Sequence, residues 1–297
     1  MGRRLRLYTV FVNSSIALDR QIPTPYEKEA SMTTQTTKGT ALITGASTGI
    51  GAIYADRLAR RGYDLILVAR SIASLDELAA SLSASTGRKV STIKADLNVT
   101  AELRAVEQRL ATDDSITMLV NNAGLGATAP LIDSKPEDLD ALITLNVLAL
   151  TRLTRAVAPR LVAKGAGSII NISSIVAVAP ELLNGTYGAS KAFVLALTQS
   201  LHHELGGKGV KVQAVLPGAI ATPFWNVAGM PVEHLPTEIV MTADDLVDAA
   251  LAGYDLGEVV TVPSLPNVAD WQTFETARLA MGPNLSRTKP AARYNVA

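Results

Sequence analysis

Short apolar segments alternate with helical patterns along most of this chain, and this alternation restricts the possible folds more than any other feature. Seven segments from residue 39 onward have the length and apolar character of buried strands. They are GTALITGA, DLILVAR, KVSTIKADL, ITMLVNNAG, GSIINISS, VKVQAVLPG and EVVTV. The segments between them carry apolar residues at helical spacing. Strands that are apolar on both faces and alternate with helices predict a parallel sheet covered by helices on both sides.

No internal repeat, low-complexity linker or change of composition divides residues 39–265. We therefore predict one doubly wound α/β domain with a parallel sheet of about seven strands over this range, although a length of 297 residues would also fit two domains. Helices are expected near residues 49–62, 74–86, 100–112, 136–164, 187–206 and 243–253. The remaining chain is predicted to form a flexible N-terminal extension, residues 1–38, and a C-terminal tail, residues 266–297, that packs on the domain or caps it.

Composition excludes several functional classes. Lys and Arg together number 27, as do Asp and Glu, so the chain has no basic excess for binding a nucleic-acid backbone. It has no cysteine, which excludes disulfides, thiolate catalysis and cysteine-type zinc sites. The stretch His202–Glu204 does not predict a metal site, because adjacent helical residues point in different directions. No uninterrupted apolar run approaches the roughly 20 residues that span a bilayer, so we expect a cytoplasmic protein without a membrane partner.

The first 31 residues allow more than one interpretation. They begin MGRRLRLYTVFVNSSIAL, a basic start followed by a short apolar segment, which weakly resembles a signal peptide. No clear small-residue cleavage site follows. Met32 opens a polar lead into the first strand, so residues 1–31 could also be a flexible tail or an over-long start. We favour these over a targeting segment.

A glycine-rich loop, TGASTGIG at residues 44–51, lies where the first strand ends and a helix begins. Gly45 permits a tight turn, Gly49 lets the backbone approach a pyrophosphate closely, and Gly51 lets the helix pack near the strand. The helix N-terminus adds free N–H groups and the positive end of its dipole. The spacing G-x-x-x-G-x-G differs from the usual dinucleotide fingerprint, and a turn that simply needs glycine is the alternative. The position between strand and helix favours a nucleotide site.

The second strand ends in LVARS, which bears on the choice of nucleotide. Folds that bind NAD generally have an acidic residue here for the ribose hydroxyls, whereas a basic residue accommodates a 2′-phosphate. This chain has Ala69 at the acidic position, followed by Arg70 and Ser71. A guanidinium binds phosphate through charge-assisted hydrogen bonds, so NADP(H) is favoured over NAD(H). The alternative is a solvated surface arginine.

Five motifs together resemble those of the short-chain dehydrogenase/reductase family. They are TGASTGIG, NNAG at residues 121–124, NISS at 171–174, YGASK at 187–191 and LPG at 216–218. They occur in that family's order and spacing, over roughly residues 39–262. The resemblance implies a Rossmann-type fold and an NADP(H)-dependent oxidoreductase. The reaction would move a hydride between the nicotinamide and a ketone, an aldehyde or a secondary alcohol.

The resemblance also assigns roles to individual residues. Ser174, Tyr187 and Lys191 match the family's catalytic set, and Asn146 matches a frequent fourth member. The residues expected to bind the cofactor are Gly45, Ser47, Thr48, Gly49, Ile50, Gly51, Arg70, Ser71, Asp96, Leu97, Asn122, Ala123, Gly124, Tyr187, Lys191, Pro217, Gly218, Ile220 and Thr222. No metal is expected. Asn146 could instead only bridge backbone groups, and Thr222 could be a loop hydroxyl without a cofactor contact.

These residue types suit proton transfer to a carbonyl. A free tyrosine has a pKa of about 10, and a lysine one helical turn away plus an oxidised nicotinamide would lower the pKa of Tyr187. Tyr187 would donate its proton to the carbonyl oxygen, and Ser174 would hydrogen-bond that oxygen. Lys191 would also bind the nicotinamide ribose, and Asn146 could hold a water in a proton relay.

The segment after Pro217 is expected to form a mobile lid over the site. Its apolar residues, which either line an apolar pocket or pack on the body, are Phe224, Trp225, Val227, Met230 and Val232. The family commonly forms dimers or tetramers through the helices near 136–164 and 187–206. Here VTVPSLPNVADW replaces the usual glycine-rich end of the last strand, which puts the tetramer contact in doubt.

Two other functions stay open. One is a cofactor-binding sensor or scaffold without turnover, although such a protein need not keep Ser174, Tyr187 and Lys191 together. The other is a relative of sugar-nucleotide epimerases or dehydratases. Residues 218–297 look too short for the substrate domain that those enzymes carry.

Overall fold

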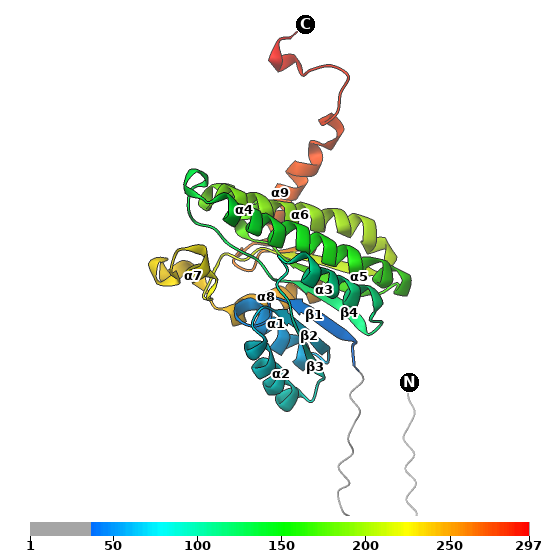
Figure 1. The fold of residues 1–297 in the computed structure, drawn as a ribbon. Coiled ribbons are helices and arrows are strands. Elements are labelled where there is room, and N and C mark those ends of the chain that lie inside the picture. The colour runs from blue at the N-terminus through cyan, green and yellow to red at the C-terminus, as the bar shows by residue number, and fades with distance from the viewer. Residues whose placement is uncertain (1–36, 297) are drawn as a thin grey trace, which may run out of the picture. The chain divides into compact units, whose positions relative to one another are not determined.

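A seven-stranded parallel sheet forms the centre of the protein in the computed structural model, which describes residues 37–296 (Figure 1). The strand order is β3-β2-β1-β4-β5-β6-β9. The strands are β1 (Thr40–Thr44), β2 (Asp64–Ala69), β3 (Val90–Lys94), β4 (Ile116–Asn121), β5 (Gly167–Ile172), β6 (Val210–Val215) and β9 (Val260–Thr261). Each lies within one of the seven predicted segments, so the predicted fold class is confirmed. The predicted N-terminal extension, residues 1–38, lies outside the described range except for residues 37 and 38. The alternative interpretations of residues 1–31 lie wholly outside it.

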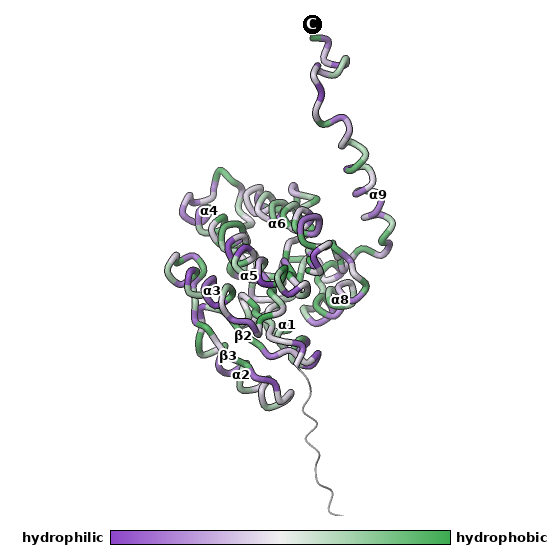
Figure 2. Tube along the Cα trace, turned by 90° about the vertical axis from the view of Figure 1, so that its right-hand side faces the viewer, coloured by the Kyte–Doolittle hydropathy of each residue, from purple (hydrophilic) through white to green (hydrophobic). Residues whose placement is uncertain are grey.

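Helices cover both faces of this sheet. Helices α1 (Gly49–Arg60), α2 (Ile72–Thr86) and α8 (Ala243–Leu256) contribute to one core cluster. Helices α3 (Thr100–Thr112), α5 (Leu150–Lys164) and α6 (Gly185–Leu205) contribute to the other. Along helices such as α3 and α5, hydrophobic and hydrophilic residues alternate (Figure 2), as expected for a helix with one buried face. The doubly wound arrangement therefore follows from the alternation in the sequence.

The chain order of the strands reverses beside β1, which pairs with β2 on one side and with β4 on the other. At such a switch point the loops after neighbouring strands diverge to opposite faces of the sheet and leave a crevice at the carboxyl ends of the strands. The glycine loop follows β1, and the NNAG motif begins at the end of β4. The two motifs are therefore neighbours although more than seventy residues separate them.

The predicted helix near residues 136–164 is continuous but irregular. It consists of α4 (Pro136–Ile143), a π-helical segment (Thr144–Ala149) and α5. Within the described range, 37–296, this helix is the one long and apolar enough to cross a membrane by length and hydropathy. Leu153, Val157 and Leu161 on α5 are buried in the core against α3 and the sheet. Core packing therefore accounts for part of its apolar character.

Two short elements lie between β6 and α8 in the region predicted to form a lid. β7 (Ala219–Ile220) pairs in parallel with β8 (Val240–Met241), and α7 (Phe224–Ala228) lies between them. The pairing of β7 with β8 ties the two ends of the lid together. Sequence patterns did not predict either strand.

The C-terminal segment forms one more helix, α9 (Val268–Ala280), which has no buried residue. Its contacts with the domain include two side chains. Trp271 packs partly buried against the cluster of Leu195, Ala214, Leu216 and Val260, and Glu275 accepts a hydrogen bond from Gln199 Nε2 at 2.8 Å. Among the described residues, none beyond Ser264 lines the main cavity described below. The division into domain and tail at residue 265 stays a prediction.

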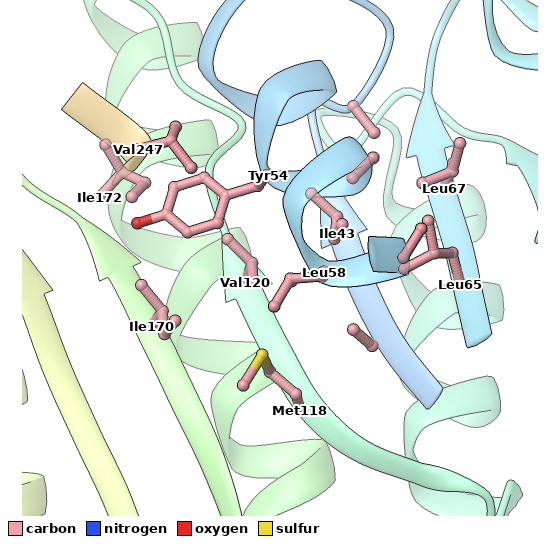
Figure 3. Packing of buried hydrophobic residues seen from close by; sticks show 14 of the residues in the cluster. Ile43, Tyr54, Leu58, Leu65, Leu67, Met118, Val120, Ile170, Ile172 and Val247 are labelled. Carbon is pink, nitrogen blue, oxygen red and sulfur yellow. The ribbon is translucent and has the colours of Figure 1, made fainter. Parts of the chain in front are cut away.

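Tyr54 is the largest fully buried side chain in the cluster of α1, α2 and α8 (Figure 3). Its ring lies beside Ile172 and Val247, and its hydroxyl has no hydrogen-bond partner among the described residues. Burial raises the pKa of this phenol far above its ordinary value. A buried hydroxyl without a partner costs about 1–3 kcal/mol relative to water.

Replacing Tyr54 by Phe is therefore expected to raise the free energy of unfolding by about 1 kcal/mol. The change removes the unpaired hydroxyl and keeps the ring that fills the core. Urea denaturation of the two proteins side by side measures the difference. A lower stability of Tyr54→Phe would show that the hydroxyl has a partner that the protein atoms do not supply.

Candidate active site

One large cavity, of about 1160 Å³, opens at the carboxyl ends of the strands. All the predicted cofactor residues except Gly51 line it, and so do Ser174, Tyr187 and Lys191. The sequence motifs come from the ends of β1, β2, β3, β4, β5 and β6 and from the start of α6. The fold therefore brings these dispersed motifs to one site. Gly51 and Asn146 lie outside the lining, and each has a specific packing role.

The glycine loop has the backbone geometry expected of a tight turn. Gly45 and Gly49 have φ angles of +64° and +56°, a region that side-chain-bearing residues rarely adopt. A Cβ atom on Gly51 would lie 2.3 Å from the carbonyl oxygen of Gly45 and 2.5 Å from Nδ2 of Asn122. Gly51 thus permits close packing beneath the loop, as predicted. Thr48 begins α1 without a side-chain cap, so backbone N–H groups at this end remain available to an anion in the cavity.

Arg70 and Ser71 lie at the edge of the same cavity, after β2. Arg70 is exposed, and none of the described residues forms an ion pair with it. Ser71 caps α2 by accepting a hydrogen bond from the backbone N–H of Ser74 at 3.4 Å. The arginine is therefore free to bind a ligand, while the serine also has a structural role.

Tyr187 is positioned by the first turn of α6. Asn184 caps this helix: its Oδ1 accepts hydrogen bonds from the backbone N–H groups of Thr186 and Tyr187 at 2.9 and 3.2 Å. Asn184 Nδ2 donates to the carbonyl oxygen of Ala129 at 2.6 Å. The cap is buried and ties the start of α6 to the loop after β4. Sequence analysis did not single out Asn184, although an asparagine just before a helix is a recognised capping signal.

Ser173 and Ser174 differ in their use of the hydroxyl group. Ser173 Oγ donates to the carbonyl oxygen of Lys191 at 2.8 Å and so links the end of β5 to α6. Ser174 Oγ lies beside the Tyr187 phenol and lowers its pKa, opposing the effect of burial. Of the two serines, Ser174 is thus the one that lies at the phenol.

Lys191 is buried one turn after Tyr187. Its Nζ donates to the carbonyl oxygen of Ile172 at 2.9 Å and lies 5.8 Å from the centre of the Tyr187 ring. Burial lowers the pKa of Lys191 to about 8 and raises the pKa of Tyr187 to about 12. The expectation that the lysine would lower the tyrosine pKa is therefore not met in the protein alone. Desolvation of the phenol outweighs the attraction of an ammonium at this distance.

The low pKa of Lys191 predicts that stability without cofactor depends on pH. Between pH 8 and the lysine's ordinary value of 10.5, the unfolded chain holds a proton that the folded chain has released, so stability rises with pH. Tyr187 opposes this only above its ordinary value of 10.0. From pH 8 to 10 we expect Lys191 to contribute a gain of about 2 kcal/mol. Urea denaturation compares wild type with Lys191→Met, and an equal gain in both would contradict the prediction.

Asn146 lies in the π-helical segment and is buried behind the cavity wall. Its Oδ1 accepts from the backbone N–H of Leu125 at 2.9 Å, and its Nδ2 donates to the carbonyl oxygen of Leu125 at 2.8 Å. Nδ2 also donates to Ser190 Oγ at 3.0 Å, and Ser190 Oγ donates to the carbonyl oxygen of Tyr187 at 2.8 Å. The alternative interpretation, in which Asn146 bridges backbone groups, describes these contacts. Ser190 thereby connects Asn146 to the helix that carries Tyr187.

The lid contributes part of the cavity wall. Phe224, Trp225 and Val227 line the cavity, whereas Met230 and Val232 do not. Thr222 also lines it, and its Oγ1 makes only a long contact of 3.4 Å with the carbonyl oxygen of Ile220. Lining residues that sequence analysis missed include Gly126, Val176, Leu182, Leu183, Leu235 and Ile239. They lie in loops and short 3₁₀ turns, where apolar residues have no regular spacing to reveal them.

Residues 37–296 contain no group of three or more histidine, aspartate or glutamate side chains arranged to hold a metal ion. The cavity lining instead brings a phenol and an amine, those of Tyr187 and Lys191, close to each other. A phenol beside a hydroxyl and an amine can donate or accept a proton, and the uncapped helix end and Arg70 can bind phosphate groups.

Comparison with known proteins agrees with this geometry. The family model described as short chain dehydrogenase matches residues 39–230. Human 17-beta-hydroxysteroid dehydrogenase type 3 is 32% identical over 73% of this chain and 68% of its own length. The very-long-chain 3-oxoacyl-CoA reductase of Bos taurus is 38% identical over 63% of this chain, which spans 61% of that relative.

Two solved structures are more similar. A short-chain dehydrogenase from Sphingobium yanoikuyae in complex with NADPH is 49% identical with a TM-score of 0.83, covering 85% of this chain and 98% of that one. The bulky-bulky ketone specific alcohol dehydrogenase from Comamonas testosteroni is 45% identical with a TM-score of 0.81, covering 87% and 99%.

Proposed function

This chain belongs to the short-chain dehydrogenase/reductase family, and we propose that it is an NADP(H)-dependent oxidoreductase acting on ketones, aldehydes or secondary alcohols. The observation that carries the proposal is the meeting of Ser174, Tyr187 and Lys191 in one cavity with the glycine loop. NADPH supplies the hydride when bound. The residues of the chain bind it, orient the substrate and move the proton.

Cofactor binding would follow the lining of the cavity. The pyrophosphate would meet the N-terminus of α1, where Thr48 leaves backbone N–H groups uncapped. Arg70 would bind the 2′-phosphate, and Asp96 and Leu97 would line the adenine pocket. The NADPH of the Sphingobium structure supports this choice of cofactor, because that protein is 49% identical to this one.

Tyr187 would protonate the carbonyl oxygen during reduction. Its raised pKa keeps the phenol protonated at neutral pH, which suits a general acid in this direction. Ser174 would hydrogen-bond the same oxygen and stabilise the negative charge that develops there. Lys191 would hold the nicotinamide ribose and, when protonated, favour the phenolate that remains after proton transfer. Asn146 would act as a positioning residue, through Leu125 and Ser190, rather than by touching the substrate.

The substrate we propose is a largely apolar carbonyl compound. Apolar side chains from two parts of the chain line the cavity: Val176, Leu182 and Leu183 after β5, and Phe224 and Val227 on the lid. Of these, Val176, Leu183 and Phe224 pack in one cluster with Tyr187. Walls on both sides suit a carbonyl with a sizeable group on each side. The name of the Comamonas enzyme, which is specific for bulky-bulky ketones, supports this substrate class.

The first experiment is a screen of the purified full chain against a panel of ketones and aldehydes, following NADPH oxidation and, in parallel, NADH oxidation. We expect turnover of aryl and branched aliphatic ketones with a preference for NADPH. Tight NADPH binding without turnover of any carbonyl compound would favour the other candidate, a sensor or scaffold that binds the cofactor.

We also infer a cytoplasmic homodimer or homotetramer. Ile143, Leu148 and Phe193 are exposed on the helices at which the family commonly associates. Apolar side chains that would be covered by a second copy favour association. Light scattering after size-exclusion chromatography distinguishes the monomer, the dimer and the tetramer.

A further inference from the structure

Gly126 and Phe224 meet end-on at the wall of the cavity. Gly126 lies in the loop after β4, and Phe224 begins α7 on the lid. A Cβ atom on Gly126 would lie 2.2 Å from Cζ of Phe224 and 2.9 Å from both Cε atoms. The φ angle of Gly126 is not in the left-handed region. The missing side chain, rather than backbone conformation, is therefore what this position requires.

The same ring borders the proposed proton donor. The ring centres of Phe224 and Tyr187 are 6.0 Å apart at 44°, and Trp225 stands edge-on to Phe224 at 5.8 Å. Phe224 also packs against the apolar cluster that contains Val176 and Leu142. The phenyl ring thus bounds the space beside the Tyr187 phenol on the lid side.

The two segments that meet at this contact, α7 and the loop after β4, are each held by hydrogen bonds. Thr128 Oγ1 donates to the carbonyl oxygen of Ala228, at the end of α7, at 2.7 Å. Trp225 Nε1 donates to the carbonyl oxygen of Ile220 at 2.8 Å. On the other side, Asn146 holds the backbone of Leu125, next to Gly126. The contact between ring and glycine therefore joins two anchored segments and is not a chance approach of two mobile loops.

We propose that the pair Gly126–Phe224 sets the size of the carbonyl substituent that fits beside Tyr187. This inference rests on the proposed function, because it assumes that a carbonyl compound binds at the phenol. Without a side chain at position 126, the ring tip rests against the loop and leaves the space beside the phenol open. A larger residue at position 126 would push the ring away from the loop and into the cavity that it lines.

The test uses phenyl ketones whose second substituent is methyl, propyl or phenyl. Their dissociation constants are measured by calorimetric titration in the presence of NADPH, in a Tyr187→Phe background that prevents turnover. We expect Phe224→Ala to improve the binding of the diphenyl ketone over the methyl ketone by about tenfold. Gly126→Ala should shift this ratio in the opposite direction, and in a Phe224→Ala background it should have no effect.

Phe274→Ala, which removes an exposed phenyl ring from α9, is the matched control and should leave the ratio unchanged. A ratio that Phe224→Ala does not change would overturn the inference, as would an effect of Gly126→Ala that is the same with and without the Phe224 ring. Failure of the chain with Tyr187→Phe alone to bind any of the ketones would overturn it too. A size-dependent binding profile without turnover in wild type would instead overturn only the proposed reaction.

Discussion

Replacing Tyr187 by Phe is expected to lower kcat for carbonyl reduction by a factor of about a thousand, which is the usual loss when a general acid is removed. The ring itself should stay in place, because it packs against Phe224 and the apolar cluster around Val176. Only the proton donor is lost. We therefore expect the affinity for NADPH and the thermal midpoint to stay close to wild type. Stopped-flow measurement of NADPH oxidation under saturating ketone measures the effect.

Tyr54→Phe is a matched control for this experiment. It removes one phenolic hydroxyl from the core, outside the cavity lining, and should keep full turnover. If Tyr187→Phe retains turnover within about twofold of wild type, where general acid catalysis predicts a far larger loss, Tyr187 is not the proton donor. A loss of NADPH binding in the same variant would instead indicate a structural role.

Replacing Arg70 by Asp is expected to reverse the choice of cofactor. Hydrogen bonds between charged groups contribute about 1.5–3 kcal/mol, so losing the guanidinium should weaken NADPH binding about a hundredfold. The new carboxylate repels the 2′-phosphate, and it can accept hydrogen bonds from the ribose hydroxyls of NADH. The ratio of kcat/KM for the two cofactors should therefore move strongly towards NADH.

Arg287→Asp makes the same change in net charge at an exposed position outside the cavity, and the cofactor ratio should not respond to it. Measuring both variants at two salt concentrations separates a local contact from the general field of the protein, because salt screens long-range effects more strongly. An unchanged ratio in Arg70→Asp would leave Arg70 as an ordinary surface residue, the alternative that the sequence left open.

The fold could be predicted because its signals are local. Each of the seven strands is marked by a short apolar run, and each major helix by apolar residues at helical spacing. Gly45 and Gly51 could be interpreted in the same way, since a tight turn and a close approach require glycine whatever the surroundings. The short strands β7 and β8 escaped prediction because both lie in the irregular connection between β6 and α8, outside the strand–helix alternation.

The site could be predicted only as a set of positions. Five motifs indicated that Ser174, Tyr187 and Lys191 belong together, and the cavity contains all three. Their protonation could not be predicted, because the pKa of a group depends on how much water its neighbours exclude. The expectation of a lowered tyrosine pKa considered the nearby lysine and left out the burial of the phenol.

The sequence by itself determined the layered α/β fold, the glycine turn and the residue types at the carboxyl ends of the strands, because these depend on spacing along the chain. Only the tertiary structure decided that Asn146 forms hydrogen bonds with the backbone of Leu125 and that the Phe224 ring packs against Gly126. Nearly one hundred residues separate Phe224 from Gly126 along the chain. Contacts of this kind arise when distant segments pack, and no local pattern records them.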